Sequence, residues 1–153
     1  MINDFKAALQ SGKHSDVIVE VKGEKFKLHK VILAARNPYF DSVFNCDLLG
    51  RSTHIVTIKD TEPHIFRSFI HFLYTGEVDK LSPENVCDLY VVAEKFQEDQ
   101  LKKMCLQLML NTLSVNSFYD YIILALRYIN ANLFQKYVEF FIPKGKKNAH
   151  DIK

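Results

Sequence analysis

The sequence predicts an α+β fold, in which a small three-stranded sheet is flanked by helices and followed by a helical annex. Three short segments before residue 59 are rich in β-branched and aromatic residues that alternate in period two. From residue 61 onward, apolar residues recur instead at helical spacing, in segments separated by Gly, Pro and capping residues. A chain of 153 residues is long enough to bury such a core without disulfides or a metal.

The opening segment, residues 4–10, is expected to be a short helix with Asp4 as its N-cap and Gly12 as its stop. A helix of this length is not stable alone. Its apolar face must therefore pack on its own domain or on a second copy of the chain. That face comprises Phe5, Ala8 and Leu9.

Two strands follow, at residues 16–21 and 24–28, and the Lys22-Gly23 turn between them predicts a hairpin. A third strand is expected at residues 54–58, buried on both faces because apolar residues dominate it.

Between the second and third strands, the period changes to that of a helix. Residues 30–37 are expected to form a short helix that ends before Pro38, since proline disfavours helical geometry in the residue preceding it. A second helix should then run to residue 44, and the mixed composition of residues 45–53 indicates a loop.

The remaining helices are expected to begin at residues with capping side chains and to end at Gly or Pro. Helix starts are placed at Thr61, Ser82, near Asp99, and at Ser114 and Asn130, and stops at Gly76 and Pro143. The helix after Ser114 should bury Phe118, Ile122, Ala125 and Ile129, and the helix after Asn130 should bury Leu133, Phe134, Val138 and Phe141.

Composition excludes several classes of function. The net charge of +2 is too small for nucleic-acid binding by phosphate neutralisation, and no apolar stretch approaches the length of a membrane span. The three cysteines are odd in number and lack CxxC spacing, which is typical of an intracellular protein without a disulfide framework or a zinc knuckle. No phosphate-binding loop and no nucleophile–base pair is present, so we expect no catalytic site, no metal and no cofactor.

Two local features have more than one interpretation. His29 lies at a strand-to-helix junction, where hydrogen bonding to the backbone is a better explanation than catalysis. The basic run near the C-terminus, residues 144–147, is typical of a solvated terminus, with nuclear targeting as the alternative.

Three blocks of sequence resemble the BTB/POZ domain family. They are Ser15-Asp16-Val17, the segment from Phe26 through Leu28-His29-Lys30 to Asn37-Pro38-Tyr39-Phe40, and Phe72-Leu73-Tyr74-Thr75-Gly76. The residue pattern of the second block is most similar to that of the speckle-type POZ and TD-and-POZ branch. The resemblance implies a dimerisation domain over residues 1–113 and a three-box-like helical pair over residues 114–142. The composition of residues 143–153 predicts a polar, basic, disordered tail.

In this family, the first helix and the first core helix form the face of a homodimer. By resemblance, the dimer face of this chain consists of Ile2, Phe5, Ala8, Leu9 and Ile32, although these residues could instead pack onto their own domain. Lys30 is expected to pair with Asp16 in a charged pocket.

The speckle-type branch also implies a partner, the N-terminal domain of cullin-three, which recruits the protein into a cullin–RING ubiquitin ligase. The implied contact residues are Val43, Phe44, Leu48, Leu49 and Phe118. The chain departs from the family at Gly50, where a glutamate is usual, and one of the two leucines could fold back onto Phe44.

The functional hypothesis is therefore a homodimeric adaptor in the nucleus or cytoplasm, which brings cullin-three to substrates that are bound by a region outside this chain. The alternative is an oligomerisation module of the transcription-regulator type that does not bind cullin, and the glycine at position 50 favours this alternative.

Overall fold

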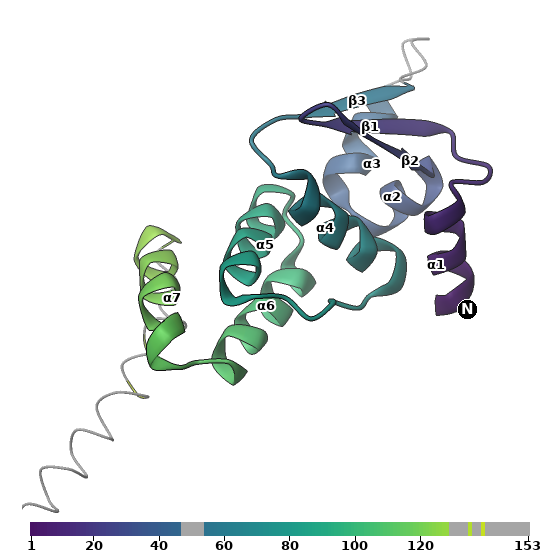
Figure 1. Ribbon diagram of the computed structural model, residues 1–153. Helices are drawn as coiled ribbons and strands as arrows, with labels where there is room; N and C mark the ends of the chain where they lie inside the picture. Colours follow the sequence, from purple (N-terminus) through teal and green to yellow (C-terminus); the bar gives the residue numbers. More distant parts are fainter. Residues whose placement is uncertain (47–53, 129–134, 136–138, 140–153) are drawn as a thin grey trace, which may run out of the picture. The chain divides into compact units, whose positions relative to one another are not determined.

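The computed structural model describes residues 1–46 and 54–128, together with residues 135 and 139. It contains two compact units, Met1–Cys105 and Leu106–Lys153. The first unit holds the sheet and the helices that pack on it (Figure 1). The mixed α+β architecture that the sequence predicts is confirmed.

The sheet has three strands in the order β2-β1-β3, which are β1 (Val17–Val21), β2 (Glu24–Leu28) and β3 (Ile55–Ile58). β1 pairs antiparallel with β2 and parallel with β3. Lys22 and Gly23 join the hairpin with φ angles of 47° and 85°, which are the two positive values that a tight hairpin turn requires. The predicted hairpin is thus confirmed.

Helices pack on one face of this sheet, and in the view of Figure 1 the sheet lies above α2, α3 and α4. Phe26 of β2 contacts Phe66 of α4 with ring centroids 5.1 Å apart, and alternate residues of β1 are fully buried. The helices α2 (Lys30–Arg36), α3 (Pro38–Asn45), α4 (Pro63–Thr75) and α5 (Pro83–Lys95) belong to the first unit. Helix α6 (Asp99–Asn111) begins in this unit and ends in the second.

Several helix boundaries agree with the sequence prediction because local chemistry determines them. Asn37 separates α2 from α3, and its side chain accepts hydrogen bonds from the backbone of Tyr39 and Phe40 at the start of α3. Ser82 caps α5, and Gly76 ends α4 with a φ of 75°, a left-handed conformation that favours glycine.

The start of α4 was predicted wrongly. The N-cap is Glu62 rather than Thr61, whose side chain is buried with its hydroxyl 3.4 Å from the Lys95 ammonium. The threonine hydroxyl has a tertiary partner on α5, and this partner outweighs its capping propensity.

The first helix, α1 (Ile2–Ser11), is longer than the predicted 4–10 helix. Its N-cap is Met1, and Asp4 lies in the first turn, with its carboxylate 3.1 Å from the terminal amino group. A carboxylate stabilises the first turn of a helix without capping it, so a capping residue and a first-turn acid look alike in the sequence. The predicted stop at Gly12 is confirmed, with φ at 59°.

β3 was predicted to be buried on both faces, and this is wrong. Val56 and Ile58 are buried, but Ile55 is 56 % exposed and Thr57 is exposed as well. The helices cover one face of the sheet, and apolar composition alone does not reveal which face a strand leaves open.

The described part of the second unit consists mainly of α7 (Val115–Tyr128), whose start near Ser114 is confirmed. The line of buried residues is Ser117, Tyr121 and Leu124, so the predicted stripe through Phe118 and Ile122 is displaced. Ser117 and Tyr121 hydrogen-bond to Thr112, at 3.1 Å and 2.8 Å. These polar contacts orient α7 so that Ser117 and Tyr121 are buried, while Phe118 and Ile122 are only half-buried.

Of the predicted loop 45–53, Asn45 belongs instead to the last turn of α3, and residues 47–53 lie outside the described residues. The cap predicted at Asn130, the helix after it and the tail 143–153 also lie outside them. Among the described helices, none is long and apolar enough to cross a membrane.

Candidate protein-interaction surface

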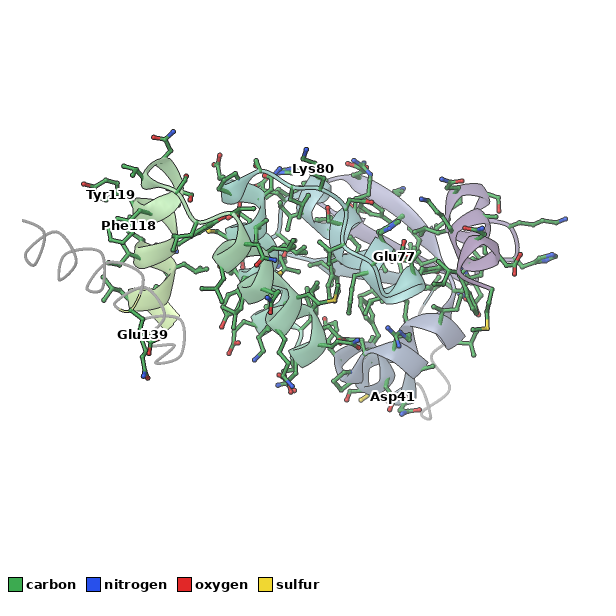
Figure 2. The ribbon with its side chains drawn as sticks, turned by 90° about the horizontal axis from the view of Figure 1, so that it is seen from below. Asp41, Glu77, Lys80, Phe118, Tyr119 and Glu139 are labelled. Carbon is green, nitrogen blue, oxygen red and sulfur yellow. The ribbon has the colours of Figure 1, made fainter. Side chains whose placement is uncertain are left out.

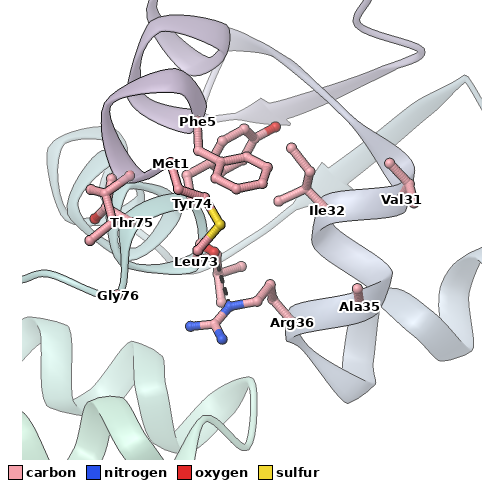
Figure 3. A pocket seen from close by; sticks show the side chains of 11 residues that line it. Met1, Phe5, Val31, Ile32, Ala35, Arg36, Leu73, Tyr74, Thr75 and Gly76 are labelled. Atoms are coloured by element: carbon pink, nitrogen blue, oxygen red, sulfur yellow. Dashed lines mark hydrogen bonds between the residues drawn. The ribbon is translucent and has the colours of Figure 1, made fainter.

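An apolar groove lies between α1, α2 and the C-terminal end of α4. Its volume is about 540 Å³, and Figure 3 shows Met1, the N-cap of α1, and Phe5 of α1 facing Val31 and Ile32 of α2 across it. Phe5 is 41 % exposed and Val31 is 73 % exposed. The complete lining is Met1, Ile2, Phe5, Val31, Ile32, Ala35, Arg36, Leu73, Tyr74, Thr75 and Gly76.

The groove exists because α1 is only partly packed. None of its ten residues is fully buried, although Ile2 and Phe5 are large and apolar. An amphipathic helix of this length gains its stability from the burial of its apolar face. The described residues leave that face half covered, which is what an interface with another molecule requires.

Polar groups at the groove hold its floor and mark its rim. Arg36 donates from Nε to the carbonyl oxygen of Leu73 over 3.2 Å, so the last turn of α2 is fastened to α4 (Figure 3). The guanidinium brings a positive charge to the edge of an otherwise apolar surface. A charged rim around an apolar centre is typical of protein–protein interfaces.

His29 and Tyr74 form a buried network beneath the groove. The Tyr74 hydroxyl accepts from the backbone N–H of His29 and contacts His29 Nδ1, both at 2.9 Å, while His29 Nε2 lies 2.7 Å from the carbonyl oxygen of Lys13. The arrangement is satisfied if the tyrosine donates to Nδ1 and Nε2–H donates to Lys13. Burial raises the pKa of Tyr74 to about 12, so the hydroxyl stays protonated and available as a donor.

This network confirms the structural role predicted for His29. It connects the loop after α1 to the start of α2 and the end of α4, so it fixes the relative positions of all three elements that line the groove. Within the part of the chain that the structure describes, no cluster of three or more His, Cys, Asp or Glu residues could hold a metal.

The structure brings Asp16 and Lys30 together, but Asp16 bonds to the backbone N–H of Lys30. The Asp16 carboxylate accepts a hydrogen bond from the backbone N–H of Lys30 over 2.8 Å, at the first turn of α2. The Lys30 ammonium lies 5.6 Å from the centre of the Phe44 ring. The aspartate thus satisfies a donor at a helix N-terminus, a role that the expected charge pair did not include.

The residues predicted for the dimer face divide into two sets. Ile2, Phe5 and Ile32 line the groove, whereas Ala8 and Leu9 are half-buried and lie outside it. Leu9 lines a separate cavity of about 360 Å³ beside Phe26 and His71.

Sequence reasoning missed other members of the groove, above all Val31 and Arg36. The useful signal was helical spacing on α2, because Val31 and Ala35 are four residues apart and lie on one face. Met1 was missed because the helix was expected to begin later.

The residues predicted for cullin binding are only partly described. Val43 and Phe44 are half-buried on α3, where Phe44 stacks on Phe40 with ring centres 6.1 Å apart. Leu48 and Leu49 lie outside the described residues. Phe118 belongs to the second unit.

α7 has its own exposed apolar surface. Phe118 and Tyr119 project from one side of the helix (Figure 2), and Tyr119 is 70 % exposed. Phe118 is half-buried, whereas Val115, Ile123 and Leu126 on the same side are exposed as Tyr119 is. A helix that is apolar on two faces needs a second packing partner.

A small sheet covered by helices on one face, with a preformed apolar groove beside a half-packed first helix, defines a protein-interaction domain. Comparisons with known proteins identify its family. A model of the BTB/POZ domain matches residues 5–113, and the chain belongs to the BTB/POZ domain family, whose members are protein-interaction and oligomerisation modules.

Two relatives illustrate the match. TD and POZ domain-containing protein 4 of the mouse is 31 % identical over 141 residues, which cover 92 % of this chain and 38 % of the mouse protein. The chain thus spans well under half the length of that relative. The solved BTB domain of zebrafish PATZ1 is 26 % identical with a TM-score of 0.63, over 73 % of this chain and 90 % of the zebrafish chain.

Proposed function

We propose that this chain forms a homodimer through the groove between α1 and α2, and that the dimer acts as an adaptor that recruits the cullin-three N-terminal domain to a cullin–RING ubiquitin ligase. The observation that carries the first half is the exposed apolar lining of the groove, with Ile2 and Phe5 both more than 40 % exposed on a helix that buries no residue fully. A two-fold interface would place α1 of each copy against α2 of the other.

The second half rests on resemblance. The chain is similar to TD and POZ domain-containing protein 4 of the mouse. The sequence of residues 114–142 resembles the three-box pair that follows the BTB domain in the speckle-type branch. Val43 and Phe44 on α3, Leu48 and Leu49 after it, and Phe118 on α7 are the proposed contacts. Substrates would be bound by a region outside this chain, and the adaptor would act in the nucleus or cytoplasm.

The dimer is tested by light-scattering mass on a double variant of the groove. Ile2→Glu with Phe5→Glu introduces two carboxylates into the proposed interface, where unpaired charges are strongly disfavoured, so a monomer is expected. The matched control is Asn3→Glu with Ala7→Glu, which places the same charges on exposed positions of α1 outside the groove lining and should leave the dimer intact. Equal masses for the two variants would refute a dimer through this groove.

Cullin binding is tested by calorimetric titration with the cullin-three N-terminal domain. Leu48→Glu with Leu49→Glu should weaken binding by at least about tenfold, because apolar anchors carry most of the energy of such interfaces. Lys80→Glu, a charge change at an exposed position after α4, should leave the affinity unchanged.

A second candidate is an oligomerisation module that does not engage cullin. Gly50, in place of the glutamate usual in the family, favours it. Loss of a carboxylate weakens an interface strongly where the group is buried and hydrogen-bonded, and only slightly where it lies at the rim. Under this candidate the wild-type dimer shows no heat of binding with cullin-three, and the double leucine variant behaves as the wild type does.

A further inference from the structure

The two edges of the sheet differ in how they are protected. β2 forms one edge, and both of its solvent-facing residues, Lys25 and Lys27, are charged and exposed. Charged side chains, especially lysine, are a common device that prevents an edge strand from pairing with another chain. β3 forms the other edge, and its solvent-facing residues are Ile55 and Thr57. This edge lacks the device that β2 has.

The pairing of β3 with β1 determines which of its backbone groups point outward. Ile18 aligns with Ile55, and its N–H donates to the carbonyl oxygen of His54 over 2.8 Å. In a parallel ladder the residues of each strand alternate between the two sides, so Val56 also faces β1. The N–H and C=O groups of Ile55 and Thr57 therefore point away from the sheet.

These outward groups have no hydrogen-bond partner within residues 1–46 and 54–128. Ile55 is also 56 % exposed, so the open edge presents a large apolar side chain beside its unpaired backbone groups. β3 itself contains no proline and no charge between Ile55 and Ile58. Its edge therefore has the backbone groups and the side chains of a strand that pairs with another strand.

We propose that β3 pairs antiparallel with β3 of a second copy of this chain, and so joins two three-stranded sheets into one. The sequence of the edge is suited to a two-fold axis at Val56, because Ile55 of one copy then faces Thr57 of the other, twice. Each facing pair exchanges two backbone hydrogen bonds, which gives four across the interface. No like charges face each other in this register, since His54 faces Ile58 of the other copy.

The interface is distinct from the groove between α1 and α2, and the inference does not rest on the dimer proposed there. If both form, each copy has two different two-fold interfaces, and dimers associate into larger assemblies. Four hydrogen bonds and two side-chain contacts make a small interface, so we expect this association to be weak and visible only at high protein concentration.

Charge reversal with rescue tests the pairing. In Ile55→Lys with Thr57→Lys, a lysine faces a lysine of the second copy twice, and in Ile55→Glu with Thr57→Glu the same positions carry two facing carboxylates. Like charges directly opposite each other destabilise a strand pair, and opposite charges stabilise it. Each variant alone should keep the mass of the assembly that lacks the β3 pair. An equal mixture of the two variants should form the larger assembly that the β3 pair joins.

The measurement is sedimentation velocity from about 10 to about 500 μM protein, a range that covers weak association. The wild type should increase in mass over this range, and both charged variants should show an association constant at least about tenfold lower. The matched control, Asn3→Lys with Ala7→Lys on the outer side of α1, should associate as the wild type does. A wild-type mass that is constant over the range, or a mixture that fails to restore association, overturns the proposal.

The same experiment in the Ile2→Glu, Phe5→Glu background separates the two interfaces. If the groove dimer and the strand pair both exist, this background forms dimers at high concentration, and the further substitutions Ile55→Lys and Thr57→Lys convert it to a monomer. If only the groove proposal fails, the background has the mass of the wild type at every concentration. If only the strand pair fails, the background stays monomeric throughout.

Discussion

Asn37 connects two helix junctions that are distant in the chain. Its side-chain oxygen accepts from the backbone N–H groups at the start of α3, and its Nδ2 donates to the carbonyl oxygen of Phe96 and to the carboxylate of Glu98, both at 3.0 Å. The side chain is 1 % exposed, so every one of these bonds is formed away from water. One amide thus satisfies the end of α5 and the start of α3 together.

We expect Asn37→Ala to lower the free energy of unfolding by about 3 kcal/mol, because it removes a helix cap and leaves buried acceptors without a donor. Urea unfolding followed by circular dichroism measures this. Asn37→Asp is the informative comparison, since it keeps the capping oxygen but loses the amide donor and faces Glu98 with a second carboxylate. A loss below about 1 kcal/mol for the alanine variant would contradict the assigned network.

The buried thiol of Cys105 should make the free energy of unfolding depend on pH in the alkaline range. Burial raises the pKa of its thiol from 9.0 to about 12 in the folded protein. Between these values the unfolded chain loses the proton and the folded chain keeps it, so the contribution of this group is complete below pH 9 and decreases as the pH rises toward 12.

Cys105→Ala should therefore flatten the dependence of the free energy of unfolding on pH in this interval, even though the small cavity lowers stability somewhat at neutral pH. Cys46→Ala removes an exposed thiol and should leave the slope as it is in the wild type. Urea midpoints collected across the interval provide the comparison. An unchanged slope in Cys105→Ala would show that other groups determine the alkaline transition.

Among the elements, those set by local chemistry were the most predictable from sequence. The hairpin follows from Lys22-Gly23 and the start of α5 from Ser82-Pro83, since each signal acts within four residues. The start of α4 and the orientation of α7 could not be predicted, because Thr61 and Tyr121 obtain partners that are distant or defined only once the chain has folded.

The candidate groove could likewise be predicted only where local sequence determines it. The apolar face of α1 predicted that Phe5 lies in the groove, but the position of α2 beside it depends on the His29–Tyr74 network, whose members are 45 residues apart. No periodicity in the sequence encodes such a contact. Val31 illustrates the consequence, since its place in the lining of the groove is evident only once the chain has folded.

α1 itself should depend on the dimer for its order. Because it buries no residue fully, its backbone amides are expected to exchange with solvent faster whenever the groove is unoccupied. Val31→Glu disturbs the proposed interface from α2 without altering the sequence of α1, and hydrogen–deuterium exchange should show loss of protection in residues 2–11. Val115→Glu, which changes an equally exposed valine on α7, is the control. Equal protection of α1 in both variants would mean that its packing on α4 is sufficient.

At the scale of the whole molecule, the proposed dimer couples association to folding. Two copies that bury their grooves together are stabilised by mass action, so the free energy of unfolding of the dimer increases with protein concentration. Raising the concentration about a hundredfold should add about 2.7 kcal/mol per dimer, since only the folded form associates. The urea midpoint of the wild type should rise accordingly, whereas the midpoint of Val31→Glu should be independent of concentration.

Circular dichroism at two concentrations makes the measurement, with Val115→Glu expected to follow the wild type. If the wild-type midpoint is constant as well, the fold is stable as a monomer and the groove contributes to binding without contributing to folding.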